Sequence, residues 1–179
     1  MLSQSLHDID RPDGNYKGLD LENFMVFCLL DRAMPYSKVC FTFDTLKAKG
    51  LITRKALAET QPKAIAKVLK SAGFRFPNQT ANFLHKFGQN PIDLKTASRD
   101  DLVKSVYGMG PKLASMFLRN TRGETYAVVD VHIRRWLAER GYNPKAPYQE
   151  LEDAFLKEAS KLGRDPRDLD LEIWEERRI

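Results

Sequence analysis

The chain has 179 residues, which is enough for one large domain or two small lobes with a buried core. Hydrophobic residues make up 42% and charged residues 30%, as in a globular protein in water, and no apolar stretch is long enough to cross a membrane. The net charge of +5 is compatible with a polyanionic partner, whereas two cysteines, Cys28 and Cys40, argue against a disulfide framework, a four-cysteine zinc site or a four-cysteine iron–sulfur cluster.

The start of the chain is acidic, with Asp8, Asp10, Asp13 and Asp20 in the first 20 residues. It lacks the positively charged start and the apolar run of a secretion signal. We therefore expect a cytoplasmic protein with no cofactor and no metal, in which both cysteines are small core residues.

Helical periodicity dominates the first half of the chain. Residues 19–30 are apolar enough for a buried helix, and a stripe at positions 39, 43 and 46 predicts a second helix. Another stripe, at 65, 68, 69 and 72, follows Pro62, which suits a first helical turn. A further short helix is predicted around 83–87, and Gly88 is placed to end it.

The second half continues in the same way. Ser98 and Asp101 form a predicted capping box for a helix to about Tyr107, and a helix that starts at Pro111 should stop at Gly123. Asp130 is placed to cap the next helix, and helical stripes return at 151–162 and 169–174. Only 127–129 alternates like a strand, so we predict an all-α protein with about eight to ten helices.

The segment between two of these helices reads YGMGPK at 107–112. Glycines in such a turn can adopt positive φ and leave backbone amides pointing outward. Together with the N-terminus of the following helix, Gly108 and Gly110 can hold a phosphate without reading a base. The alternative interpretation of the turn is a plain helix break with a glycine cap.

The turn belongs to a longer pattern: GMGPKLA at 108–114, FLR at 117–119 and VDVHI at 129–133. This pattern resembles the helix-hairpin-helix (HhH-GPD) DNA glycosylase superfamily, and within it the type-2 8-oxoguanine DNA glycosylases. Weaker similarity in FCLL at 27–30, GFRF at 73–76 and LDLEIW at 169–174 extends the resemblance over most of the chain.

The resemblance implies an all-α fold of two helical lobes with the active site in the cleft between them. Residues 1–179 would form a single HhH-GPD domain, with the helix-hairpin-helix at about 99–122. The implied activity is a bifunctional DNA glycosylase/AP lyase of base excision repair, which removes 8-oxoguanine by way of a lysine Schiff base. The implied partner is double-stranded DNA with a damaged base, in a prokaryotic cytoplasm beside the chromosome.

In the superfamily that this chain resembles, the lysine and the aspartate of the pattern are catalytic, which points to Lys112 and Asp130. Lys112 would lie in the first turn of its helix, where the positive end of the helix dipole opposes an ammonium ion and favours a neutral amine able to attack a sugar carbon. Asp130, also at a helix start, would stay an anion, stabilise positive charge that develops on C1′ and help to deprotonate the amine. An ordinary surface lysine and an ordinary helix cap are the alternatives.

Further candidates surround this pair. His132 and Arg134 are candidate contacts to the DNA backbone, although His132 can equally be a packing residue. Three more cations have the same possible role, or are solvated charges: Lys104, Arg119 and Arg135. In the resembling family the C-terminal segment helps to build the base pocket, so Trp174 is a candidate to stack on a flipped purine, with packing under the last helix as its alternative.

The chain departs from the type-2 pattern at two places. Those enzymes typically end in a lysine that helps to recognise the oxidised base, whereas this chain ends in Arg177, Arg178 and Ile179. Relatives often have Gln or Asn within the segment that reads DRAMP here, at 31–35, so Arg32 or Met34 would fill the gap left by the flipped base.

Two other functions fit the same motifs. One is a cluster-free relative of endonuclease III that acts on another damaged base, and the other is a non-catalytic helix-hairpin-helix module that only holds the DNA backbone. We expect a monomer, because no heptad seam and no extra apolar helix face stand out.

Overall fold

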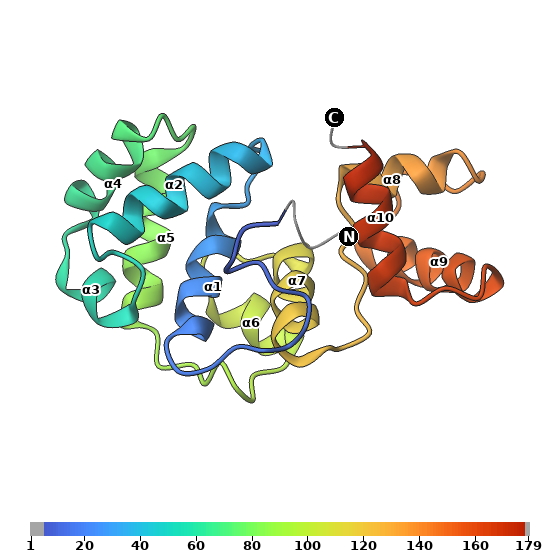
Figure 1. Ribbon diagram of the computed structural model, residues 1–179, viewed down its shortest axis with the longest axis horizontal. Helices are drawn as coiled ribbons and strands as arrows, with labels where there is room; N and C mark the ends of the chain where they lie inside the picture. The colour runs from blue at the N-terminus through green and yellow to red at the C-terminus, as the bar shows by residue number, and fades with distance from the viewer. Residues whose placement is uncertain (1–5, 178–179) are drawn as a thin grey trace.

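The computed structural model describes residues 6–177, and these form helices and connecting loops without a β-strand. The tripeptide 127–129 is therefore extended chain rather than part of a sheet. Ten helices follow one another along the described residues (Figure 1): α1 Asp20–Leu30, α2 Tyr36–Ala48, α3 Arg54–Glu59, α4 Pro62–Ser71, α5 Pro77–Gln89, α6 Arg99–Ser105, α7 Pro111–Arg122, α8 Val131–Ala138, α9 Tyr148–Lys161 and α10 Pro166–Arg177.

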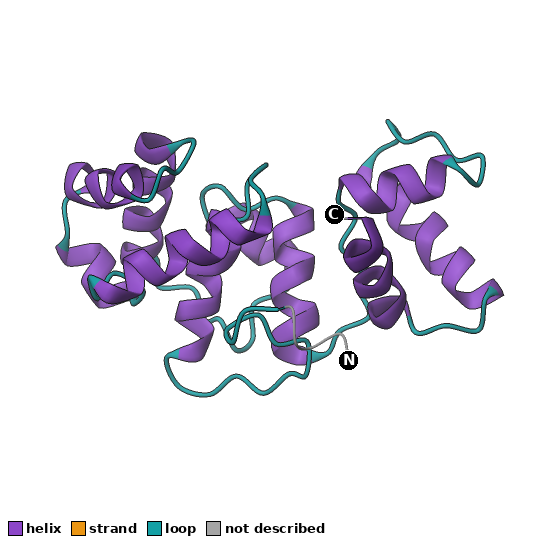
Figure 2. Cartoon of the chain, turned by 45° about the horizontal axis from the view of Figure 1, so that its top comes forward, coloured by secondary structure: helices purple, strands orange, loops and turns teal. Residues whose placement is uncertain are grey.

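The helices share two hydrophobic cores. The larger core collects the buried side chains of α1 to α7, and the smaller one collects those of α8, α9 and α10. Figures 1 and 2 show α8, α9 and α10 gathered at one end of the molecule, with α1 and α7 between them and the group formed by α2 to α5. The segment 123–130 joins the two cores, since Val128 belongs to the larger and Val129 to the smaller.

Helix α1 lies at the centre of the larger core. Every residue from Phe24 to Leu30 is buried, so the helix is covered on all sides. A helix that is apolar all round must be buried in this way. This confirms the helix predicted for 19–30 and fixes the position of the loop that begins at Asp31.

Local signals set most helix ends. Ser98 and Asp101 form the predicted capping box of α6, and Asp130 caps α8 as predicted. Pro62 and Pro111 occupy the first turns of α4 and α7, and Gly123 ends α7 in the left-handed conformation. These predictions are confirmed, with α6 ending at Ser105, two residues earlier than expected.

The prediction for Gly88 was wrong. Helix α5 runs from Pro77 to Gln89, so Gly88 lies inside it rather than after its end. A Cβ at Gly88 would stand 2.4 Å from the backbone nitrogen of Ala58 and 2.8 Å from the carbonyl oxygen of Arg54. The glycine is needed because α5 packs directly against the backbone of α3, which a single sequence does not reveal.

The cysteines differ from one another. Cys28 is buried, as expected, whereas Cys40 is only half-buried on α2. In the described part of the chain, no helix is long and apolar enough to cross a membrane.

Candidate active site

The predicted hairpin consists of α6, the turn 106–110 and α7. Gly108 has a φ of +84°, and a Cβ there would come within 2.5 Å of the ring of Phe83 on α5. Gly108 is thus required both by its conformation and by its neighbour. Gly110 was expected to share the positive φ, but its φ is −101° and it serves instead as the N-cap of α7, with no side chain capping the helix. The amides of the first turn of α7 are therefore left for an external anion.

A large cavity opens beside the N-terminus of α7. Its volume is 990 Å³, and its lining includes Lys112 and Asp130. Both hydrophobic cores contribute to the wall, for example through Met116 from the larger and Ile133 from the smaller. A cavity of this size suits a small molecule or a single nucleotide.

Lys112 makes an ion pair that the sequence analysis did not anticipate. Its Nζ lies 3.0 Å from Oδ2 of Asp31, the first residue after α1. The side chains of Lys112 and Asp31 are 32% and 23% exposed, and both line the cavity. In this structure the amine of Lys112 therefore has a carboxylate directly beside it in the cavity.

Asp130 is held by the helix that it caps. Its Oδ1 accepts hydrogen bonds from the backbone amides of His132 at 2.8 Å and Ile133 at 2.9 Å. Both bonds are made to the same oxygen, so they leave the second carboxylate oxygen available. Asp130 can therefore cap α8 and still present a negative charge to the cavity that it lines.

Three further predicted site residues also line this cavity: His132, Arg134 and Trp174. Arg134 donates to the carbonyl of Pro144 at 2.8 Å, which ties α8 to the loop before α9. The Nδ1 atom of His132 is buried and has no hydrogen-bond partner in the described part of the chain. Trp174 on α10 meets Tyr36 edge to face, with ring centroids 4.9 Å apart, and together they form an aromatic wall.

Buried charges line the side of the cavity next to α10. Arg119 on α7 donates to Asp170 on α10 at 2.5 Å and to the neighbouring Asn120 at 3.1 Å, and Asn120 donates to Asp10 at 2.7 Å. Arg119 is only 4% exposed, so the prediction of a phosphate contact or a solvated charge was wrong for this residue. Burial raises the pKa of Asp170 to about 6, although Arg119 opposes the shift, and burial likewise raises the pKa of Asp10.

The candidate gap-filling residues lie in the loop between α1 and α2. Arg32 stacks on the ring of Phe83 at 4.6 Å and reaches Gln79 on α5, while Met34 lines the cavity. Since Phe83 also contacts Gly108, this loop and the hairpin turn share a neighbour. The other departure from the type-2 pattern, at Arg178 and Ile179, lies outside the described residues.

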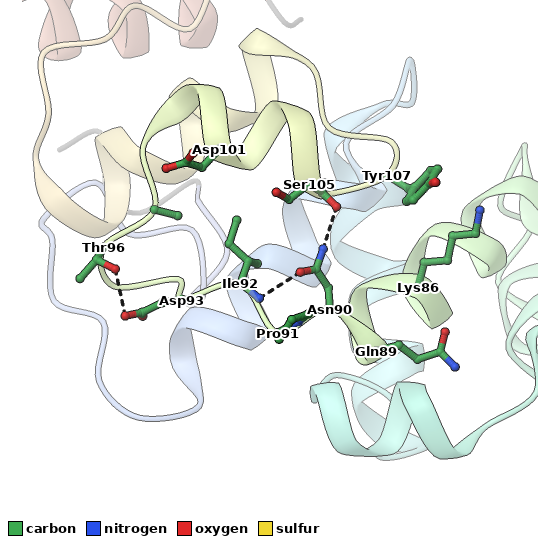
Figure 3. Close-up of a pocket in the computed structure, with 11 residues that line it drawn as sticks. Lys86, Gln89, Asn90, Pro91, Ile92, Asp93, Thr96, Asp101, Ser105 and Tyr107 are labelled. Atoms are coloured by element: carbon green, nitrogen blue, oxygen red, sulfur yellow. Dashed lines mark hydrogen bonds between the residues drawn. The ribbon is translucent and has the colours of Figure 1, made fainter.

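A second cavity, of 770 Å³, lies between the end of α5 and α6 (Figure 3). Asn90 crosses it to donate to the carbonyl of Ser105 at 2.7 Å, and the ammonium of Lys86 lies 3.8 Å from the ring centroid of Tyr107. It contains neither Lys112 nor Asp130. These contacts join the end of α5 to α6 and to the turn that follows it, and thus support the hairpin.

A family model described as 8-oxoguanine DNA glycosylase matches residues 12–164, which is most of the chain. The chain belongs to this 8-oxoguanine DNA glycosylase family. A relative from Thermoplasma acidophilum, named 8-oxoguanine DNA glycosylase/AP lyase, is 37% identical in an alignment of length 127 that covers 63% of this chain. The match spans 61% of that relative's length, about three fifths.

Solved structures of the family have the same all-helical fold. The 8-oxoguanine DNA glycosylase of Thermotoga maritima has a TM-score of 0.77 and 27% identity, covering 97% of this chain and 86% of its own. The Methanocaldococcus jannaschii glycosylase/lyase, solved with 15mer DNA containing 8-oxoguanine, has a TM-score of 0.74 and 23% identity, covering 94% and 86%. The predicted all-α, helix-hairpin-helix fold is confirmed.

Three residues that line the cavity were not predicted as site residues: Asp31, Asp10 and Tyr36. Tyr36 donates its hydroxyl to Asp10 at 2.8 Å, and all three line the cavity. The one available signal was the acidic residue directly after the apolar FCLL segment, because a charge that follows a buried helix so closely requires a partner.

Proposed function

We propose that this chain is a bifunctional DNA glycosylase/AP lyase that excises 8-oxoguanine from double-stranded DNA. The observation that carries the proposal is that Lys112, at the start of α7, and Asp130, at the start of α8, both line one cavity. The family membership and the name of the Thermoplasma acidophilum relative support the same reaction and substrate.

The hairpin grips the DNA backbone in this proposal. Unpaired amides at the start of α7 bind a phosphate next to Gly110, and the positive φ of Gly108 sets the conformation of the turn. His132 and Arg134 also line the cavity, where they can meet a further phosphate. The grip is independent of base sequence, as a search for rare lesions requires.

The damaged nucleotide leaves the duplex and enters the cavity, since its glycosidic bond is inaccessible inside the stack. Trp174 and Tyr36 offer a face on which a flipped purine stacks. Lys112 attacks C1′ while Asp130 stabilises the positive charge that develops there. The base departs, a Schiff base remains, and elimination of the 3′ phosphate cuts the strand.

We also infer a monomer that works beside the chromosome in a prokaryotic cytoplasm. A prokaryotic relative supports the location. The exposed large apolar side chains support the monomer, because each lies on a different segment of the chain: Leu19, Phe41, Phe76, Tyr107, Val131 and Leu162.

Borohydride trapping tests the proposed reaction. Wild type, Lys112→Gln and a control, Lys161→Gln, are incubated with duplexes that carry 8-oxoguanine, thymine glycol or an abasic site. Lys161 is a surface lysine that pairs with Glu158 at 2.7 Å. We expect a covalent adduct on 8-oxoguanine and abasic DNA with wild type and Lys161→Gln, and none with Lys112→Gln.

Other results identify the alternatives. An adduct on thymine glycol but not on 8-oxoguanine indicates an enzyme like endonuclease III. Duplex binding without an adduct on any substrate indicates a module that only holds the backbone.

A further inference from the structure

We propose that Asp31 is a second catalytic carboxylate, which takes the proton from Lys112 before the amine attacks. The inference rests on the proposed function, because it assigns a role within that reaction. Its central observation is the 3.0 Å contact between Lys112 Nζ and Asp31 Oδ2. This distance lies inside the range of about 2.6–3.2 Å over which a general base accepts a proton directly.

The position of Asp31 is rigidly set. It follows α1, whose last seven residues are all buried, and its own amide donates to the carbonyl of Cys28 at 3.1 Å. Lys112 comes from the first turn of α7, which packs beside α1. Two buried helices thus hold the carboxylate of Asp31 and the amine of Lys112 together at the cavity wall, as the geometry of proton transfer requires.

Asp130 is placed for a different task. Its Oδ1 is engaged by two amides of α8, and the ion pair of Lys112 is made with Asp31. A carboxylate that caps a helix is stabilised as an anion, which suits the stabilisation of a cationic sugar better than it suits proton uptake. The two carboxylates therefore divide the work, one serving the amine and the other the sugar.

The proton transfers balance. Lys112 passes one proton from Nζ to Asp31 Oδ2, and the lone pair so freed forms the bond from Nζ to C1′. The bond between C1′ and the base breaks, and its electron pair leaves with the base. Asp31 then returns its proton to the departing base, so that the step ends with a cationic secondary amine on Lys112 and a carboxylate on Asp31.

Chemical rescue tests this role. The full-length wild type, Asp31→Ala and Asp31→Asn are compared in single-turnover excision from an 8-oxoguanine duplex, with and without sodium formate. The control is Asp44→Asn, which removes a carboxylate from a surface ion pair with His7. We expect both Asp31 variants to lose about 100-fold or more in rate and the control to keep the wild-type rate.

Formate should restore the rate of Asp31→Ala at least tenfold and leave Asp31→Asn unchanged, since only the alanine leaves room for a free carboxylate. Asp31→Asn preserves the shape of the side chain and reports the rate loss if the alanine variant does not fold. An unchanged rate, a faster rate or a loss that formate does not relieve in folded Asp31→Ala overturns the inference alone. An inactive wild type overturns the proposed function and this inference together.

Discussion

Burial changes the chemistry of the Asp170 carboxyl group. It is 3% exposed, it accepts from Arg119, and its second oxygen accepts weakly from the amide of Val128 at 3.4 Å. Desolvation disfavours its anion more than these donors favour it, so that its pKa rises to about 6. A proton on Asp170 would remove the negative charge that faces Arg119 beside the proposed base pocket.

The titration of Asp170 is the first prediction. We expect its carboxyl carbon, followed by ¹³C NMR, to titrate near pH 6, with the resonance identified by its loss in Asp170→Asn. Between about pH 6 and pH 4 the folded protein then binds more protons at this group than the unfolded chain does. The contribution of Asp170 to the free energy of unfolding therefore increases as the pH falls through this window, and is lost as the pH rises through it. A midpoint below pH 4 would contradict this assignment.

At the scale of the element, the hairpin shows why its two glycines are not equivalent. Gly108 needs a positive φ and the absence of a Cβ, because Phe83 lies against it. Gly110 has an extended φ and no atom within 4 Å of the position of a Cβ. A side chain introduced at Gly108 should therefore destabilise the turn, whereas one introduced at Gly110, two residues later, should be tolerated.

Serine substitutions test this difference. Gly108→Ser should lower the free energy of unfolding by about 2 kcal/mol, from strained backbone and the contact with Phe83. Gly110→Ser, the matched control, should change it by less than about 0.5 kcal/mol, since serine is a good N-cap. Urea unfolding measures both values. Equal losses would show that the turn does not depend on the conformation of Gly108.

At the scale of the whole molecule, polar contacts join the two hydrophobic cores across the cavity. Arg119 belongs to α7 beside the larger core, and Asp170 belongs to α10 beside the smaller. Asn120 and Asp10 extend the connection to the segment before α1. Because the partners are buried, removing one charge leaves the other without compensation.

A double-mutant cycle tests the connection. Arg119→Met should lower the free energy of unfolding by about 3–5 kcal/mol, because it leaves Asp170 buried and unpaired. Adding Asp170→Leu should recover a large part of that loss, since the apolar pair needs no compensation. Urea denaturation of wild type, both single variants and the double variant gives the coupling energy. Strictly additive losses would mean that the two charges are not coupled.

Much of the helical fold was predictable from the sequence because it depends on local chemistry. The capping box at Ser98, the prolines that start α4 and α7, the stop at Gly123 and the cap at Asp130 each act within a few residues of chain. The same locality placed Lys112 and Asp130 at the starts of their helices, and the resemblance then suggested their roles.

Contacts between distant segments were decided only by the tertiary structure. Asp31 lies 81 positions from Lys112 in the chain, and Arg119 lies 51 from Asp170. Helix periodicity indicates which face of a helix is buried but not which helix covers it. For the same reason Gly88 was predicted to end a helix, whereas it lies where α5 packs directly against the backbone of α3. The partner of the lysine and the polar lining of the cavity therefore emerge only when α1, α7 and α10 pack together.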